Sequence, residues 1–209
     1  MAEVDSLVPR GLQESFRGSR FCPEGVRRES GRPILGMSMN GLGRGKEPVT
    51  VLAGPYGHPF HPILVTVPIG AWVASLVFDI GSRLVDSDAA ALATGSRWLI
   101  AIGVLGAAAA ALIGFLDLFA IPTRTPAFRT AMVHMSLNVT ITAAYLVNFL
   151  LRLGQGPVPT GLIVMSALSI AALGVSGYLG GKLAFQYGIR VVDQEAQAAG
   201  FDPTSTAKD

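Results

Sequence analysis

Charged side chains are scarce in this sequence. Of its 209 residues, 16 are Lys or Arg and 14 are Asp or Glu, so charged residues make up 14% of the chain. Soluble domains carry about 25% because their surfaces must be hydrated. Hydrophobic residues make up 50% of the sequence, and its mean hydropathy is +0.49. The deficit of charge therefore indicates a protein whose surface largely faces lipid.

Cysteine and catalytic or nucleic-acid-binding patterns are also lacking. The single cysteine, Cys22, excludes an intramolecular disulfide, and also an iron–sulfur cluster or thiolate zinc site held by this chain alone. A net charge of +2 without a Lys/Arg stripe among aromatics excludes nucleic acid as a partner. We see no metal-binding HExxH or EF-hand motif, no phosphate loop and no nucleophile–base pair. Independent catalytic activity is therefore not expected.

Four apolar stretches are long enough to cross a bilayer, whose hydrocarbon core of ~30 Å requires ~20 helical residues. We expect transmembrane helices at about residues 62–85, 98–121, 130–153 and 161–187. Lipid-exposed strands are excluded, because open sheet edges would leave backbone groups unpaired in hydrocarbon. The sequence thus predicts an all-α fold, an antiparallel bundle of four transmembrane helices within residues 54–192, in contact with the lipid bilayer.

Polar segments flank the predicted bundle. Residues 1–50 have no sustained apolar period and are expected to be disordered, and residues 193–209 form a polar tail. Met37 and Met39 are alternative starting points of the chain. Four crossings place both ends on one face, which carries more basic residues near the membrane than the opposite face does. Because basic loops favour the cytoplasm, we expect a plasma (inner) membrane protein with cytoplasmic termini. The two sets are Arg44, Lys46, Arg124, Arg129, Lys182 and Arg190 against Arg83, Arg97 and Arg152.

Polar residues from distant segments are brought to that same face by the topology. They are His58, His61, Asp117, His134 and Asn138. Ionisable groups inside a membrane are costly and often functional. We expect His61 and His134 to approach each other, either as axial ligands of a b-type haem or, with His58 and Asp117, as ligands of a divalent metal. The alternative is that His134 holds helices together by bonding to Asn138, Asp117 or a backbone carbonyl.

Other polar and small residues have simpler interpretations. Asp117 is expected to pair with Lys182, Arg124 or Arg129. Asp79 and Arg83 are four residues apart on one helix face and are expected to form an ion pair there. The small residues Gly177 and Gly181, and likewise Gly103, Ala107 and Ala111, let helices approach closely. We expect them to pack within the bundle, with a homodimer face as the alternative.

Four segments together resemble a known bacterial family. They are GHPFHPILVTVPIGAWVASLVFD from Gly57, GFLDLFAIP from Gly114, HMSLNV from His134 and SGYLGGKLAFQYGIRV from Ser176. This pattern resembles the membrane family called domain of unknown function 2231. The resemblance implies four transmembrane helices and no established biochemical role. Some relatives are joined to Rieske-type iron–sulfur domains, which implies electron transfer, but this chain lacks their cysteine–histidine motifs.

Three functions remain in view. The leading hypothesis is a redox accessory subunit that binds a b-type haem through His61 and His134 and works with other membrane or redox proteins. The second is a structural or assembly subunit that binds membrane partners through small-residue helix faces. The third is a small transporter or proton pathway using Asp117 and His134. Transport is disfavoured because few polar residues fall mid-helix and inverted repeats are not evident.

Overall fold

The computed structural model describes residues 43–154 and 156–201, and these residues form helices and connecting loops without strands. Four helical segments are long and apolar enough to cross a membrane: Phe60–Leu84, Ala89–Leu118, Pro126–Leu151 and Thr160–Gln186. The predicted all-α fold with four membrane-spanning helices is therefore confirmed. The expected extension at residues 1–42 lies outside the described residues.

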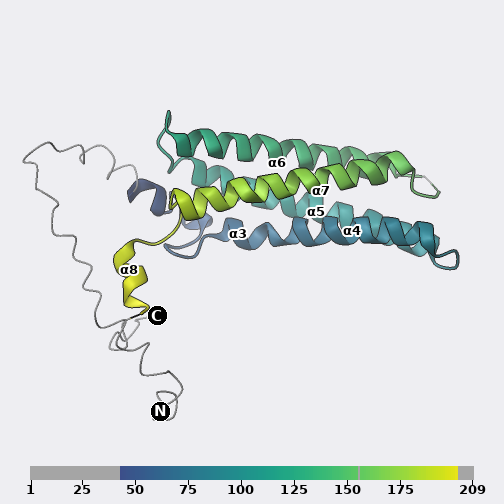
Figure 1. Cartoon of the computed structure of the whole chain (residues 1–209), viewed down its shortest axis with the longest axis horizontal. Coiled ribbons are helices and arrows are strands. Elements are labelled where there is room, and N and C mark those ends of the chain that lie inside the picture. Colours follow the sequence, from purple (N-terminus) through teal and green to yellow (C-terminus); the bar gives the residue numbers. More distant parts are fainter. Residues whose placement is uncertain (1–42, 155, 202–209) are drawn as a thin grey trace, which may run out of the picture. The chain divides into compact units, whose positions relative to one another are not determined.

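The elements follow one another as antiparallel crossings (Figure 1). A 3-10 turn, η1 (Val51–Ala53), precedes the first crossing, which consists of α3 (Phe60–Leu64) and α4 (Thr66–Leu84). Helix α5 (Ala89–Leu118) returns, α6 (Pro126–Leu151) crosses again, and α7 (Thr160–Gly181) runs into a π-helical turn, η2 (Lys182–Gln186). A short helix, α8 (Gln194–Ala199), follows. The starts of α3 and α6 and the ends of α5 and α7 share one end of the bundle, called here the terminal end.

Local sequence explains how the crossings begin and bend. Proline at position 68 cannot donate a backbone hydrogen bond, and the first crossing is interrupted three residues earlier, at Val65. The first crossing was expected to begin at about residue 62, but α3 already begins at Phe60 with Pro59 as its N-cap residue. At α6, the Thr125 hydroxyl accepts a hydrogen bond from Phe128 N at 3.1 Å, and a proline follows the cap.

Helix α5 is longer than the apolar stretch that predicted it. It starts at Ala89 rather than near residue 98, because the alanine-rich turns after Asp88 favour helix despite their polar neighbours. Its 30 residues correspond to about 45 Å, which exceeds a hydrocarbon core of ~30 Å. Helix α5 is therefore longer than the hydrocarbon core, and its first turns could not be predicted from apolar residues alone.

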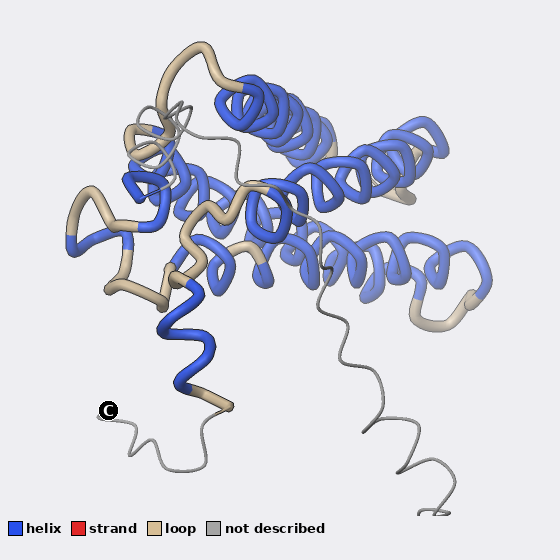
Figure 2. Tube along the Cα trace, turned by 60° about the vertical axis from the view of Figure 1, so that its left-hand side comes forward, coloured by secondary structure: helices blue, strands red, loops and turns tan. Residues whose placement is uncertain are grey.

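The four crossings form a ring in which α4 and α6 each lie beside α5 and α7. Helices α4 and α6 thus occupy opposite corners, as Figures 1 and 2 show. Their large side chains meet across the centre, where the rings of Trp72 and Tyr145 stack with centroids 4.1 Å apart and planes at 8°. Ile100 and Ile141 complete this buried core. The middle of the bundle is therefore filled by apolar and aromatic side chains.

The segments at the terminal end are tied together, contrary to the expected disorder up to residue 50. Arg190 N donates to the Gly45 carbonyl at 2.8 Å, and Lys46 Nζ donates to the Val192 carbonyl at 3.0 Å. Asp193 N also donates to the Tyr56 hydroxyl at 2.9 Å. These bonds satisfy backbone groups that no helix pairs, so the chain just before the first crossing is part of the folded unit.

We predict that Gly103→Ala destabilises the protein whereas Gly177→Ala does not. An added Cβ at Gly103 would overlap the Trp72 indole, while at Gly177 it would meet nothing within 4 Å in the described part of the chain. Overpacking costs about 1–3 kcal/mol, which corresponds to a fall in melting temperature of about 3–10 °C. Thermal unfolding in detergent measures this difference, and equal melting temperatures for both variants would contradict the packing described.

Candidate functional site in the bundle core

A pair of histidines lies inside the terminal end. His61 belongs to α3 and His134 to α6, and their ring centroids are 6.4 Å apart with an angle of 79° between the ring planes. His61 Nδ1 is 2.8 Å from the Ala110 carbonyl oxygen, and His134 Nδ1 is 2.9 Å from the Ser176 carbonyl oxygen. A carbonyl can only accept, so each Nδ1 carries a proton and donates it. In the neutral rings, both Nε2 atoms therefore keep a lone pair.

Glycines on the neighbouring helices make room for both rings. A Cβ built on Gly114 of α5 would lie 2.8 Å from the His61 ring, and one on Gly180 of α7 would lie 3.2 Å from the His134 ring. Any larger residue at Gly114 would displace an imidazole that already bonds to the same helix one turn earlier. The sequence thus positions each histidine against a carbonyl and a glycine of its adjacent helix.

Asn138 joins the histidine pair, as the sequence predicted. Its Nδ2 atom lies 3.3 Å from His134 Nε2, and it donates to the His134 carbonyl at 2.8 Å and to Ser176 Oγ at 2.5 Å. The contact with the His134 ring follows from the spacing of four residues along a helix. Asn138 therefore links α6 to α7 beside the imidazole.

His58 and Asp117 do not join the two rings in a metal-binding group. His58 is exposed, with Nδ1 3.5 Å from the Tyr56 carbonyl oxygen. Within residues 43–154 and 156–201, no three His, Cys, Asp or Glu side chains are placed to hold a metal ion. The arrangement of three imidazoles and a carboxylate considered from the sequence is thus not formed in the described structure.

Asp117 is buried and pairs with Arg190, not with Lys182, Arg124 or Arg129 as expected. Arg190 Nε lies 3.1 Å from Asp117 Oδ1, although the N–H is not aligned for a hydrogen bond. Arg190 Nη2 also donates to the carbonyls of Ala53 and Gly54 at 2.9 Å each. Sequence reasoning missed this partner because Arg190 lies beyond the last apolar stretch, where the chain turns back over the bundle.

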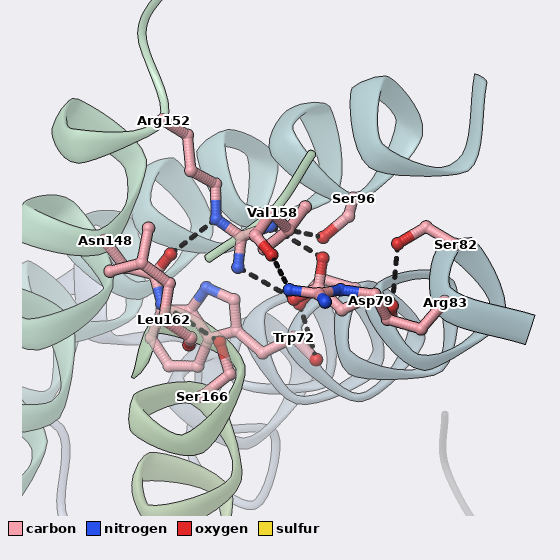
Figure 3. Close-up of polar contacts among 11 residues, drawn as sticks. Trp72, Asp79, Ser82, Arg83, Ser96, Asn148, Arg152, Val158, Leu162 and Ser166 are labelled. Atoms are coloured by element: carbon pink, nitrogen blue, oxygen red, sulfur yellow. Dashed lines mark hydrogen bonds and ion pairs between the residues drawn. The ribbon is translucent and has the colours of Figure 1, made fainter. Parts of the chain in front are cut away.

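A second polar cluster is buried at the opposite end of the bundle (Figure 3). The Arg152 guanidinium forms two hydrogen bonds of 2.7 Å to the carboxylate oxygens of Asp79. Asp79 is 0% exposed and Arg152 is 4% exposed. Arg152 also donates to Ser96 Oγ at 3.0 Å and to Asn148 Oδ1 at 2.6 Å. The ion pair joins α4 to the end of α6 across the diagonal of the ring.

The expected ion pair between Asp79 and Arg83 is wrong. Arg83 instead donates to the Val158 carbonyl (Figure 3). It also donates to Thr160 Oγ1 at 3.3 Å. Asp79 faces the bundle interior, where two parallel hydrogen bonds from a guanidinium are much stronger than an exposed pair on one helix surface. Arg152 lies within a predicted transmembrane stretch, where a cation indicates a buried partner. From the sequence, it was counted only among the basic residues near the membrane surface.

Further hydrogen bonds connect the polar side chains around the Asp79–Arg152 pair to α7. Asn148 Nδ2 donates to the Leu162 carbonyl and to Ser166 Oγ at 3.0 Å each. Tyr145 places its hydroxyl 3.3 Å from the Ser166 carbonyl oxygen. A buried ion pair is stable only when such additional bonds satisfy both charges. This cluster therefore serves to fix helix positions. In the histidine pair, the Nε2 lone pair of His134 faces the Asn138 amide, and no partner is found for His61 Nε2 among the described residues.

The two groups of small residues, one on α5 and one on α7, have different surroundings in the structure. Gly103 packs against the Trp72 indole and Ala107 is buried inside the bundle, as expected, whereas Ala111 is exposed. Gly177 is exposed on α7, and Gly181 is near only the Phe185 side chain of its own helix, at 3.9 Å. The expected packing of Gly177 and Gly181 within the bundle is therefore not found in the described structure.

Bilayer-length helices around a core of paired histidines and a buried ion pair define an integral membrane helix bundle. The model of a family described as "Predicted membrane protein (DUF2231)" matches residues 57–193, and the chain belongs to this family. No curated protein and no solved structure is significantly similar to it. The family description supports a membrane location and assigns no biochemical role.

We predict that Arg152→Leu strongly destabilises the protein, whereas Arg83→Leu has a small effect. Removing Arg152 leaves the fully buried Asp79 without its cation, and breaking such a pair costs about 3–5 kcal/mol. Arg83 is exposed, so its loss is expected to cost about 1 kcal/mol or less. Thermal unfolding of both variants in detergent measures the difference. Similar losses for the two arginines would disprove the dominant role of the diagonal pair.

Proposed function

We propose that this membrane protein is a redox accessory subunit that binds one b-type haem between His61 and His134. The supporting observation is the pair of imidazoles, 6.4 Å apart and supplied by different crossings. Metal–nitrogen bonds of about 2 Å on each side of an iron imply ring centres about 6 Å apart. The observed centroid separation of 6.4 Å is close to that value, and ligation further requires that both Nε2 atoms turn toward the iron.

The remaining contacts of the two rings suit axial ligation. The Ala110 and Ser176 carbonyls accept from Nδ1, which fixes each ring in orientation and would leave Nε2 as the ligating atom. On His134, the Asn138 amide now 3.3 Å from Nε2 would have to turn away to its other acceptors, the His134 carbonyl and Ser176 Oγ. Two imidazoles meet the need of a haem iron, whose other four ligands come from the porphyrin. Two ligands do not meet the need of a closed zinc site, which requires four. A bound haem would supply one-electron transfer, and the protein would hold it near one membrane face.

The distribution of basic residues supports a location of the proposed site on the cytoplasmic side of the plasma membrane. Arg124 is exposed in the connection from α5 to α6, Arg129 is exposed in the first turn of α6, and Lys182 lies in η2, all at the terminal end. These residues favour a cytoplasmic face and are the proposed partners of haem propionates. A separate redox protein would exchange electrons with the haem from that side, because this chain carries no second redox centre motif.

A structural or assembly role is the second candidate, and a specific observation favours it. Both imidazoles already bond to backbone carbonyls of adjacent helices, so they can act as polar links in the bundle without a cofactor. The exposed glycine at position 177 also lets another helix approach α7, from a membrane partner or from a second copy of the chain. A transport role is less well supported, because the stacked Trp72 and Tyr145 fill the centre.

We predict that protein purified from haem-replete cells shows a Soret band in its visible absorption spectrum. His134→Ala should abolish the band and His61→Ala should weaken or abolish it, because each removes one axial nitrogen. His58→Ala is the matched control, since His58 is exposed and lies outside the pair, and it should leave the band unchanged. A wild-type protein without a Soret band, together with folded variants of lower thermal stability, would support the structural role instead.

We predict that reporters fused after Asp209 and within the loop between α6 and α7 report opposite sides of the membrane. Because basic residues are in excess at the terminal end, we expect the C-terminal reporter in the cytoplasm. Paired enzyme reporters, one active only in the cytoplasm and one only outside it, make the measurement. A C-terminal fusion active only outside the cytoplasm would reverse the orientation.

A further inference from the structure

The buried side chains of α4 and α6 recur at a constant interval. His61 and His134, Trp72 and Tyr145, and Asp79 and Arg152 are each 73 positions apart. Ser75 and Asn148 follow the same interval, and both are fully buried. The first and third crossings therefore present the same register of core positions, although few of the matched residues are identical.

Helices α5 and α7 repeat at an interval of 66 positions. The His61 and Trp72 side chains bond to the carbonyls of Ala110 and Ile100. Their counterparts in α6 bond to the carbonyls of Ser176 and Ser166, which lie 66 positions later. Gly114 and Gly180, which make room for the two imidazoles, keep the same interval. Each half of the chain thus contains the same contacts between its own two helices.

Burial and backbone conformation repeat with the same interval. The buried positions 96, 100, 103 and 110 of α5 correspond to the buried positions 162, 166, 169 and 176 of α7. Within the described residues, only Arg124 and Arg190 are non-glycine residues with positive φ, at 64° and 60°, and they are also 66 positions apart. Each follows the end of the second helix of its half. Such residues are uncommon, which makes a chance match of both place and conformation improbable.

The packing of the helices has the matching symmetry. Exchanging α4 with α6 and α5 with α7 converts the contact between α5 and α6 into the contact between α7 and α4, and both contacts are present. A two-fold axis parallel to the helices relates the halves in this way. Equivalent residues nearest to that axis must face each other. The three observed diagonal contacts join such equivalents: the two histidines, the two stacked aromatics, and the ion pair.

We propose that the protein consists of two copies of one helix-hairpin unit, residues 58–124 and 131–190. In this arrangement, the Asp79–Arg152 pair makes each hairpin bind the other hairpin rather than a copy of itself. The histidine and aromatic contacts join like residues, so they would form equally well between two identical hairpins. The third contact joins opposite charges. Pairing of a hairpin with its own copy would bury two carboxylates or two guanidiniums face to face, at a prohibitive cost.

Reversing the charges in the full-length chain tests the proposed equivalence. Asp79→Arg and Arg152→Asp each place like charges at the axis and should lower the melting temperature by about 10 °C or more. The double variant restores opposite charges at equivalent positions and should recover at least half of that loss. Asp86→Arg is the control for added charge, because Asp86 is exposed in the nearby loop and should be neutral. A double variant as unstable as the single variants would overturn the proposal.

Co-expression of the two single variants tests the selection of partners. A chain carrying Asp79→Arg has two arginines at the axis, and a chain carrying Arg152→Asp has two aspartates. If hairpins are exchanged between such chains, both resulting bundles regain an opposite pair. Differently tagged full-length variants should therefore co-purify as a heterodimer, while two wild-type chains or two copies of one variant should do so much less. If the yield of inserted single variants is too low for melting, recovery of yield on co-expression is the readout. Chains that stay separate and are not recovered would overturn the role of this pair in selection.

Discussion

Asp79 and Arg152 lie on diagonally opposed helices, and neither charge can be left facing hydrocarbon at an acceptable cost. Their meeting fixes the height of α4 against α6, because the two parallel hydrogen bonds tolerate little sliding. With that height set, Trp72 stacks on Tyr145 about two turns away, and His61 faces His134 about three turns further along. The alignment of the two histidines thus depends on an ion pair at the other end of the bundle. The stacked rings of Trp72 and Tyr145 lie between these two contacts and keep α4 and α6 in the same relative position.

Apolar length and topology predicted the helical class, the number of crossings and the meeting of the two histidines. These features follow from bilayer thickness and from antiparallel connection, which act over whole segments. The partner of Asp79 could not be found in the same way, since Arg83 satisfies the local spacing while Arg152 is a neighbour only after the ring closes. The partner of Asp117 was missed for a similar reason, because Arg190 reaches it from a loop that follows the last crossing. Helix ends were the least predictable feature, as α5 shows by starting within a polar, alanine-rich stretch.

The two halves of the protein share some contacts and differ in the charge of one buried position. The contacts that orient each imidazole are the same in both halves, down to a carbonyl and a glycine at matching places. The charged positions have instead diverged to opposite signs. A symmetric pair of histidines and an asymmetric ion pair therefore lie along one axis, at opposite ends of the same two crossings.

The hydrogen bonds between residues 45–54 and Arg190 limit the order in which parts of the protein can fold during its synthesis. Arg190 and the Ala53 carbonyl to which it bonds are separated by 137 positions, so the link cannot form until all four crossings have left the ribosome. The contact between His61 and the Ala110 carbonyl lies within the first hairpin, so it needs no residue of the second one, whereas the facing His134 is synthesised later. The contacts of Arg190, which join this end of the bundle to the chain before the first crossing, are thus among the last to form.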